Sequence, residues 1–477
     1  MRDFLNKTAP PGSVGRARVL AFPRGRRGAR AAAIALLLLS GAREAPVSAE
    51  TLAEAMAAAV HHHPTLRAEQ ARKGAAQAGI DIARSGYYPR VTASGDVGAA
   101  SGPRGLSAGT GPDLGGTGRD VGGARWGYSL GAEMPLYDGM RTRSAVAEAS
   151  TGAEAASAQV LVAAQQVMLD AAIVFSDVVR DRRVEALHAR STAMLQDEVK
   201  SALQRLRGGT GTETDVAQTR ARHAQAIADL ITAKANTAIS AAEFGRVVGH
   251  APRNLSAASV PDPLLPKSME AAIATADAQN PAAAGADLRA AASGYAIDRV
   301  RADGLPQVKL RGGIDGDHGF SSRSDDRDGA SVAVRVSVPL FDGGETAARV
   351  EQAQQIQESL AEEARGVRDR VRAGVVAGWS RLAAGRDRLA SEREAVAESR
   401  RALDGVREEI RLGQRSTLEG LDAQRDLVAS EVRLAAGERD VVVAAYALLS
   451  ATGQLTLERI QGQVPPKPKT GARPVAR

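Results

Sequence analysis

Charged side chains beside two glycine-containing turns are the residues whose type and spacing best fit a chemical task. Glu419 and Asp422 stand three positions apart after Gly413, so a helix places both carboxylates on one face. Arg415 lies between Gly413 and these acids, and Asp215 stands near the other turn. If copies of the chain arranged these carboxylates in a ring, the ring would favour cations and repel anions. The alternative is that all four are ordinary solvated charges of a charge-rich helix.

Catalytic and metal-binding patterns are absent from the sequence. It contains no cysteine, which excludes disulfides, thiol chemistry and the lipid anchor of a lipoprotein. The three histidines at 61–63 are a poor metal site, because adjacent residues point in different directions on a helix. We interpret them as the polar end of a helix. The glycines do not follow a strand–helix phosphate-binding pattern either, so we expect no enzyme and no cofactor.

The net charge of +7 lies in the first 49 residues, which contain nine Lys or Arg and two Asp or Glu. The remaining chain has 53 residues of each sign, so no basic field indicates a nucleic-acid partner. The apolar stretch at 31–39 follows several arginines and is too short to span a bilayer as a helix. With small residues at Val47 and Ala49, it predicts a signal peptide cleaved after Ala49 rather than a membrane anchor.

The rest of the chain repeats one plan. The sequence PLYDG at 135–139 returns as PLFDG at 339–343, an offset of 204 residues, whereas earlier matching positions are offset by 217. The 13 additional residues of the first half lie in the glycine-rich segment 101–123, as expected for an exposed loop. Four segments follow from this plan: a signal peptide at 1–49, a first structural repeat at 50–267, a second repeat at 268–457, and a disordered basic tail at 458–477.

Each repeat places helices around two short strands. An amphipathic helix is predicted at 51–86 and again at 268–303, and a proline follows each, Pro89 and Pro306. Alternation of apolar and polar residues then predicts two strands per repeat, at 91–97, 126–134, 308–314 and 332–338. The first of these has the weakest pattern. Such alternation is typical of a soluble hairpin or of one wall of a membrane barrel.

A seven-residue period marks the long helix of the second repeat. Its apolar members are Val375, Leu382, Leu389, Val396, Leu403 and Ile410. A strict seven-residue stripe stays in line only when helices supercoil around each other. About 70 residues separate Asp342 from the turn at Gly413, which corresponds to roughly 100 Å of helix. A compact domain does not accommodate that length, so we expect a rod or one stave of a tube.

The junction between strand and long helix has the same design in both repeats. Its residues are Pro135, Tyr137, Asp138, Pro339, Phe341 and Asp342. The proline is expected to end the strand, where a missing N–H is tolerated. The aromatic residue suits a membrane–water interface, and the aspartate is expected to cap the N-terminus of the helix. The glycine that follows lets the chain bend.

Four strands cannot close a barrel within one chain. An open sheet edge in lipid leaves backbone groups unpaired, at a cost of several kcal/mol each. The hairpins are therefore either soluble, or several chains contribute strands to one barrel that continues into a tube of helices.

The ordered set of motifs resembles the TolC family of outer-membrane channel-tunnel proteins over residues 50–457. The resemblance rests on the duplicated plan, on the helix-start pairs HP at 63–64 and NP at 280–281, and on YYP before the first strand. PLYDG, PLFDGG, GTGTETDVAQTR at 209–220 and GQRSTLEGLDAQRDL at 413–427 add to it. The resemblance implies a mainly α fold with a small β part. Long antiparallel coiled-coil helices would form an α-barrel, and four transmembrane strands per chain would contribute to the 12-stranded barrel of a homotrimer.

The resemblance also implies function and partners. Such proteins are exit ducts for type I protein secretion and drug efflux, located in the cell outer membrane, in contact with its lipid, with a helical tunnel in the periplasm. They dock to a periplasmic adaptor protein and an inner-membrane transporter, expected here to be ATP-driven. The adaptor would meet the turns at Gly209, Thr210, Thr212, Gly413, Gln414, Ser416 and Thr417.

The four charged residues gain a role from the same resemblance. Residues matching Asp215 and Arg415 help hold the tunnel mouth shut, and acids matching Glu419 and Asp422 form an acidic constriction. This chain departs from the family pattern with Ile410 in place of an aromatic residue, and with Glu rather than Asp at 419.

Two other functions are compatible with the sequence: a secreted or periplasmic coiled-coil scaffold with soluble hairpins, and a periplasmic adaptor. An adaptor normally has one helical hairpin flanked by small β-domains, so a duplicated plan with short strands counts against it. The missing lipid-anchor cysteine favours protein secretion over drug efflux.

Overall fold

A computed structural model describes residues 49–100, 123–319 and 327–462 of this chain. The predicted signal peptide up to residue 48 and nearly all of the glycine-rich loop lie outside the described residues, as does the chain from residue 463 onward. The predictions for those segments therefore stay predictions.

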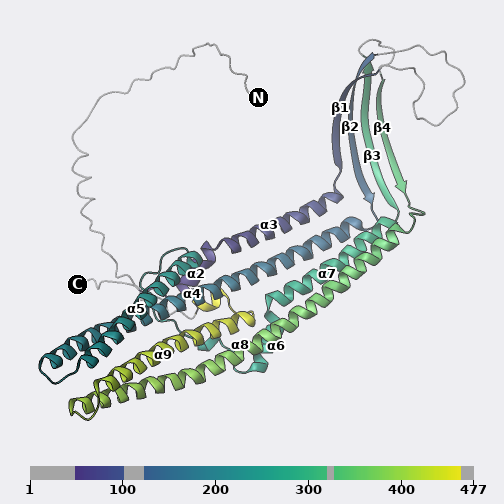
Figure 1. Ribbon diagram of the computed structural model, residues 1–477. Helices are drawn as coiled ribbons and strands as arrows, with labels where there is room; N and C mark the ends of the chain where they lie inside the picture. The colour runs from purple at the N-terminus through teal and green to yellow at the C-terminus, as the bar shows by residue number, and fades with distance from the viewer. Residues whose placement is uncertain (1–48, 101–122, 320–326, 463–477) are drawn as a thin grey trace, which may run out of the picture. The chain divides into compact units, whose positions relative to one another are not determined.

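The same order of elements occurs twice along the described chain (Figure 1). The first half consists of α2 (Leu52–His62), α3 (Pro64–Arg84), β1 (Arg90–Ala100), β2 (Gly123–Tyr137), α4 (Arg141–Arg207) and α5 (Glu213–Val248). The second half consists of α6 (Met269–Gln279), α7 (Pro281–Arg301), β3 (Gln307–Gly319), β4 (Arg327–Ser337), α8 (Glu345–Arg411) and α9 (Thr417–Ala451), followed by α10 (Leu457–Gln461).

A proline divides the helix that was predicted at the start of each repeat. His63 has φ −65° and ψ 125°, the extended backbone that Pro64 imposes on the residue before it. Asn280 has nearly the same backbone before Pro281, with φ −71° and ψ 119°. Because proline is well placed at the first position of a helix, each proline starts a new one. The prediction of one continuous helix is therefore wrong, and α2–α3 and α6–α7 take its place.

The four strands form one antiparallel sheet in the order β1-β2-β3-β4. Trp126 of β2 lies between Val97 of β1 and His318 of β3. All four predicted strands are confirmed, including the weakest, and the structure extends them to 11, 15, 13 and 11 residues. β1 and β4 are the two edges of the sheet. Within the described chain, β1 pairs only with β2 and β4 pairs only with β3, so the outer side of each edge strand has no partner strand.

The helices α8 and α9 pack along the predicted seven-residue seam. The buried members on α8 are Val375, Leu382, Leu389, Val396 and Leu403, and the facing members on α9, also seven residues apart, are Leu427, Leu434, Val441 and Leu448. Ile410 at the end of the stripe is half-buried. Both α4 and α8 contain 67 residues, which corresponds to roughly 100 Å of helix. The prediction of long coiled-coil helices is confirmed.

Small residues allow close contact between the helices on the strand side of the molecule. α3 lies beside α4, α4 beside α7, and α7 beside α8 (Figure 1). At the crossing of α7 and α4, a side chain added to Gly285 would come within 3.2 Å of the Cβ of Ala158. Alanine-rich faces thus replace the large side chains that a thick globular core requires.

The main hydrophobic core gathers where α2, α4, α5 and α9 meet. Its largest fully buried side chains include Met56, Phe175 and Phe244. An 18-residue stretch of α4 has a mean hydropathy of 1.6, enough by length and composition to cross a membrane, but half of it is buried within the chain. α10 also joins this core through Ile460, which is 4% exposed. The predicted start of the disordered tail at residue 458 is therefore wrong, because residues 458–461 are helical.

Candidate functional site

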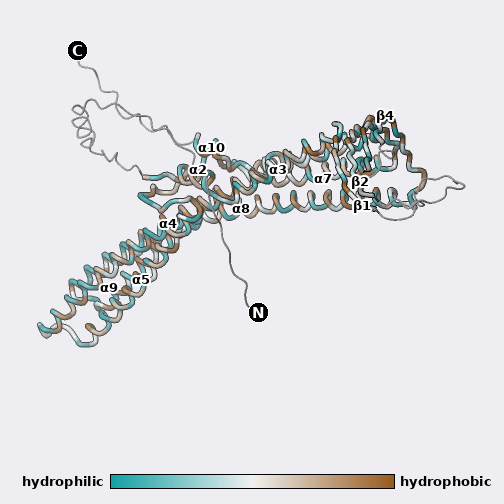
Figure 2. Tube along the Cα trace, turned by 90° about the horizontal axis from the view of Figure 1, so that it is seen from above, coloured by the Kyte–Doolittle hydropathy of each residue, from teal (hydrophilic) through white to brown (hydrophobic). Residues whose placement is uncertain are grey.

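The sheet has one apolar face and one polar face. Hydrophobic and hydrophilic residues alternate along its strands (Figure 2). The cross-strand register places on one face Val91, Val97, Trp126, Tyr128, Leu130, Met134, Ile314, Val332, Val334 and Val336, all of them exposed in the single chain. Val332 is 81% exposed and Val97 is 78% exposed. An exposed apolar face of this extent is typical of the lipid-facing wall of a membrane barrel, because in water it would be an aggregation surface.

Aromatic rings lie toward both ends of this apolar face. At the end distant from the helices, the rings of Trp126 and His318 stack with centroids 4.5 Å apart, and Tyr128 donates its hydroxyl to Asp328 at 2.8 Å. At the end beside the helices, Tyr137 pairs with Val308 on the apolar face. Phe341 follows β4 and is 91% exposed. Aromatic girdles occupy the two interfaces of a membrane barrel, and the interfacial role of Tyr137 and Phe341 stays a prediction.

An aspartate at each strand–helix junction satisfies a backbone donor of the long helix. Asp138 Oδ2 accepts the N–H of Thr142 at 2.7 Å, and Asp342 Oδ2 accepts that of Thr346 at 2.8 Å. Each aspartate stands three residues before the first helical residue. Its carboxylate accepts from the second residue of the helix, four positions further along the chain. The hydrogen bond predicted from sequence is therefore present, although the residue directly before each helix is Met140 or Gly344.

The prolines of the junctions do not end the strands as predicted. β2 continues through Pro135 to Tyr137, and its pairing with β3 shifts between these two residues. Such a bulge tolerates the missing N–H of proline inside a strand. β4 ends at Ser337, two residues before Pro339. The chain then reverses through Gly139 and Gly343, both with φ +69°.

The two tip turns, Gly208–Thr212 and Leu412–Ser416, have the same backbone geometry. Gly209 has φ +74° and Gly413 has φ +75°, a left-handed conformation that favours glycine. In each turn, the residue after this glycine donates its N–H to the carbonyl five residues back, at 2.9 Å for Thr210 and 2.8 Å for Gln414. This hydrogen bond closes the end of the long helix, as the glycines predict.

Capping residues start both return helices. Thr212 Oγ1 accepts the N–H of Asp215 at 3.1 Å, while Asp215 Oδ2 accepts the N–H of Thr212 at 3.1 Å. This reciprocal pair is a capping box. In the other turn, Ser416 Oγ accepts the N–H of Glu419 at 3.4 Å, and Thr417 is the first residue of α9. Apart from Thr417, the residues predicted to meet an adaptor are exposed in the single chain.

The predicted mouth residues are each engaged within the chain. Hydrogen bonds from the Thr212 side chain and backbone hold the pKa of Asp215 below its ordinary value, and the nearby Arg205 acts in the same direction. Arg415 contacts Glu409 at 2.5 Å and Glu419 at 3.3 Å, both beside its own turn. No ion pair joins Asp215 to Arg415 in the part of the chain that the structure describes. The contact between Arg415 and Glu419 was not predicted from the sequence. The predicted latch between Asp215 and Arg415 does not form inside one copy, and its role between copies stays a prediction.

Asp422 makes an ion pair that the sequence did not reveal. Its Oδ1 lies 2.8 Å from Nη2 of Arg222, so a carboxylate of α9 is bound to a guanidinium of α5. This pair joins the two helical hairpins, α4–α5 and α8–α9, close to their tips. Arg222 stands seven residues after Asp215 and therefore shares its helix face. That spacing is the local signal that could have indicated it.

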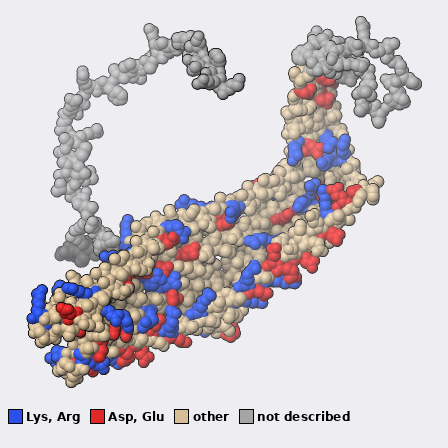
Figure 3. All heavy atoms as spheres, in the orientation of Figure 1, with Lys and Arg blue, Asp and Glu red and all other residues tan. Residues whose placement is uncertain are grey.

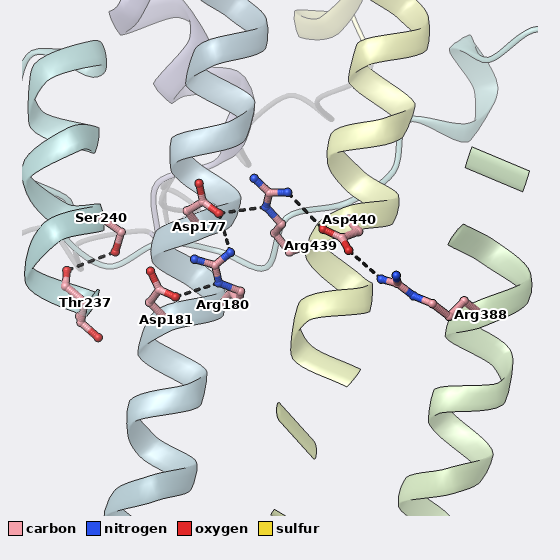
Figure 4. Close-up of polar contacts among 8 residues, drawn as sticks. All are labelled: Asp177, Arg180, Asp181, Thr237, Ser240, Arg388, Arg439 and Asp440. Atoms are coloured by element: carbon pink, nitrogen blue, oxygen red, sulfur yellow. Dashed lines mark hydrogen bonds and ion pairs between the residues drawn. The ribbon is translucent and has the colours of Figure 1, made fainter. Parts of the chain in front are cut away.

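A second set of ion pairs joins the same hairpins further from the tips (Figure 4). Arg439 Nε of α9 lies 2.9 Å from Asp177 of α4, and its Nη1 lies 3.1 Å from Asp440. Asp440 is also 2.7 Å from Arg388 of α8. Burial raises the pKa of Asp440, but hydrogen bonds from Arg388 and Arg439 outweigh it and leave the pKa below its ordinary value. Asp177 and Arg439 are 262 residues apart, so no local pattern predicts this network.

The three histidines lie where a helix ends. His61 and His62 occupy the last turn of α2, and His63 lies between α2 and α3 with 9% of its surface exposed. Basic groups in this position interact favourably with the helix dipole. Their placement agrees with the interpretation as a polar helix end.

Comparison with known proteins identifies the family. The chain matches the family model of the outer membrane efflux protein over residues 56–250 and 272–454. It is 34% identical over 436 residues to the outer membrane efflux protein BepC of Brucella suis biovar 1, a match that covers 90% of this chain and 91% of BepC. A shorter match, 32% identical over 157 residues, relates 30% of this chain to 32% of the alkaline protease secretion protein AprF of Pseudomonas aeruginosa.

Solved structures share the fold at lower identity. The outer membrane protein VceC of Vibrio cholerae superposes with a TM-score of 0.71 at 18% identity, covering 84% of this chain and 96% of VceC. The Campylobacter jejuni CmeC outer membrane channel gives a TM-score of 0.72 at 14% identity, covering 86% and 88% of the two chains. Together with the apolar sheet face, the family match and the similarity to BepC exclude the scaffold and adaptor alternatives. The chain belongs to the outer membrane efflux protein family and is a non-enzymatic channel of the outer membrane with a TolC-like fold and a periplasmic helical tunnel.

Proposed function

We propose that three copies of this chain form one export channel in the outer membrane. Each copy contributes four strands to a 12-stranded barrel, and its long helices contribute to a tunnel in the periplasm. The observation that carries this proposal is the sheet itself, which has two open edges and an exposed apolar face. Lipid cannot satisfy the backbone groups of β1 and β4. Identical copies satisfy them when β4 of one pairs with β1 of the next in a closed ring.

The tips are the proposed docking surface for a periplasmic adaptor. Their turns expose backbone and small polar side chains at Gly209, Thr210, Thr212, Gly413, Gln414 and Ser416. The adaptor in turn connects the channel to an inner-membrane transporter, which we propose is ATP-driven. The channel itself contributes a passage and no energy.

The tips are also the proposed gate. In a ring of three, Arg415 of one copy can reach Asp215 of another, and Glu419 and Asp422 form acidic rings that favour cations. Within each copy, the Arg222–Asp422 pair holds the α8–α9 hairpin against the α4–α5 hairpin. Exposed ion pairs of this kind contribute about 1 kcal/mol or less each. Binding of an adaptor therefore needs to overcome only a small free energy to open the tunnel mouth.

The cargo is proposed to leave by type I protein secretion or by drug efflux. One relative is named for efflux and the other for protease secretion, which supports a shared duct for both kinds of transport. The two routes are separated by deleting the gene and then measuring secreted protein and sensitivity to toxic compounds.

Cysteine cross-linking tests the shared barrel directly, because the natural chain has no cysteine. We expect Thr92→Cys on β1, combined in turn with cysteine at Gly329, Ser331 or Ala333 on β4, to give cross-linked dimers and trimers in membranes. These positions share the polar face of the two edge strands. The gel should show no species larger than a trimer.

The matched control replaces the edge position by one in an inner strand. Ser129→Cys on β2, combined with Ala333→Cys, lies on the same face but away from the β1 edge, and should give monomers only. A detergent-free, soluble monomer with no cross-links from any edge pair would overturn the shared barrel.

A further inference from the structure

Basic side chains cluster on the polar face of the sheet, at the end beside the helices. In one cross-strand row, Arg90 of β1, Glu133 of β2 and Arg311 of β3 lie side by side. In a neighbouring row closer to the helices, Lys309 of β3 is opposite Arg335 of β4. Four basic side chains and one carboxylate give this group a net charge of +3 per chain. We call these five residues the basic collar.

One carboxylate is too little to neutralise the collar. Glu133 accepts a hydrogen bond from Lys309 Nζ at 2.8 Å and forms an ion pair with Arg311, whose Nε lies 2.8 Å from Glu133 Oε2, so one carboxylate is shared between two cations. Arg90 and Arg335 lie on the two edge strands, and neither has an ion pair with any residue in the described ranges. Figure 3 shows basic groups on both sides of a smaller acidic patch where the sheet meets the helices. Excess positive charge is therefore concentrated at this level.

A hollow lies against the collar. Its volume is about 1010 Å³. Four basic residues, Arg90, Arg141, Lys309 and Arg311, and two acidic residues, Glu133 and Asp138, line it, so the basic side chains outnumber the acidic ones. The N-terminus of α4 contributes little to this potential, because the carboxylate of Asp138 accepts the N–H of Thr142 there. The hollow is roomy enough for a carboxylate or phosphate group of a passing molecule together with its water.

We propose that the basic collar is an anion-attracting station in the channel lumen, at the level where barrel meets tunnel, and that it favours cargo with exposed carboxylate or phosphate groups. The inference rests on the proposed trimer, which puts the apolar face against lipid and the polar face around the lumen. Three copies then place a charge of +9 around one passage. Rings of basic side chains favour anions in pores, so the collar opposes the preference of the acidic tips.

Charge selectivity of the full-length channel in planar bilayers tests the collar. With a KCl gradient across the bilayer, the reversal potential gives the ratio of chloride to potassium permeability. Lys309→Gln combined with Arg335→Gln should lower this ratio about twofold or more, because half of the basic side chains are removed. The same variant should weaken current block by added inositol hexaphosphate, a soluble polyanion.

Glu133→Gln is the matched control, since it removes a charge of opposite sign from the same collar. It should shift selectivity in the opposite direction, toward chloride, which mere loosening of the barrel would not do. Assembly of each variant is checked as a heat-modifiable trimer on gels. If the double variant fails to assemble, unchanged selectivity of Glu133→Gln alone overturns the collar.

The outcomes separate this inference from the function on which it rests. A wild-type trimer that conducts ions, with all variants sharing its selectivity, overturns the collar and leaves the channel intact. A wild-type protein that forms no trimer and no conductance overturns the proposed channel and the collar together.

Discussion

At the scale of single residues, one junction is strained and its counterpart is not. Met140 has φ +70° and is the one residue other than glycine with a positive φ in the described part of the chain. Gly344 holds the corresponding position in the second repeat, with φ +89°. A side chain in the left-handed region costs about 1 kcal/mol. The first junction therefore keeps a strain that the second avoids.

Replacing Met140 by glycine is expected to stabilise the protein. Met140→Gly should raise the free energy of unfolding by up to about 1 kcal/mol, since glycine adopts this backbone without strain. Met140→Ala is the control, because it shortens a half-exposed side chain and keeps the strain. Thermal unfolding of the detergent-solubilised channel measures both. Equal midpoints for the glycine and alanine variants would contradict the expectation.

Residue-level predictions succeeded where the cause is local. Asp138 and Asp342 could be recognised as helix caps because a cap depends on nearby backbone alone. Gly209 and Gly413 could be recognised as turns for the same reason. Pro135 was misplaced, because proline tolerates two situations in a sheet, a strand end and a bulge, and only the pairing with β3 decides between them.

At the scale of elements, ion pairs connect the α4–α5 hairpin to the α8–α9 hairpin at two levels along the helices. Arg222–Asp422 lies near the tips, and Arg439–Asp177 lies further along the helices. At that second level Asp440 also contacts Arg439 and pairs with Arg388 within the α8–α9 hairpin. The hairpins themselves are held by apolar contacts, such as the seven-residue seam of α8 and α9. We expect pH and salt to change the strength of these ion pairs. The seam of α8 and α9 consists of apolar side chains, so we expect it to be insensitive to both.

Acid should weaken the network at Asp440. Its pKa is lowered in the folded protein, so its stabilising effect is present above the ordinary carboxyl pKa and is lost as pH falls through the folded value. Asp440→Asn should lower the unfolding free energy at neutral pH by about 1 kcal/mol or less, because the carboxylate is 43% exposed and water screens it. The difference from wild type should shrink toward zero below about pH 4.

Thermal midpoints between pH 3 and pH 7 measure this dependence. Asp404→Asn serves as the control, since this exposed carboxylate of α8 has no ion pair within the ranges that the structure covers. It should show no comparable trend with pH. A deficit of Asp440→Asn that grows on acidification would mean that the carboxylate is not held in its charged form.

Element types were largely predictable, but their joints and cross-links were not. The seven-residue stripe on α8 indicated which face of this helix is buried in a coiled coil, because a hydrophobic period reports the buried face. The apolar pattern did not show the break at Pro64, because it continues across the proline. The pair HP at 63–64, a helix start in the family resemblance, was the signal that marked it. Arg439 and Asp177 come from different repeats, so no local sequence pattern around either residue predicts their ion pair.

At the scale of the whole molecule, the proposed latch between copies is expected to limit ion flow. Asp215→Ala combined with Arg415→Ala should raise single-channel conductance about twofold or more, because the narrowest charged ring loses its cross-links. Planar bilayer recordings measure it. The control is Glu408→Ala with Arg411→Ala, a charge-neutral pair of variants within α8 just before the same tip. Unchanged conductance of the first double variant would remove these residues from the gate.

The open edges of the sheet have a genetic consequence. A copy that assembles normally but blocks the passage will enter rings together with normal copies. When both are produced equally and mix at random, about one ring in eight contains normal subunits alone. An allele of this kind should therefore be dominant over the wild type, whereas an allele whose product lacks β1 or β4 should be recessive, because that product cannot join a ring.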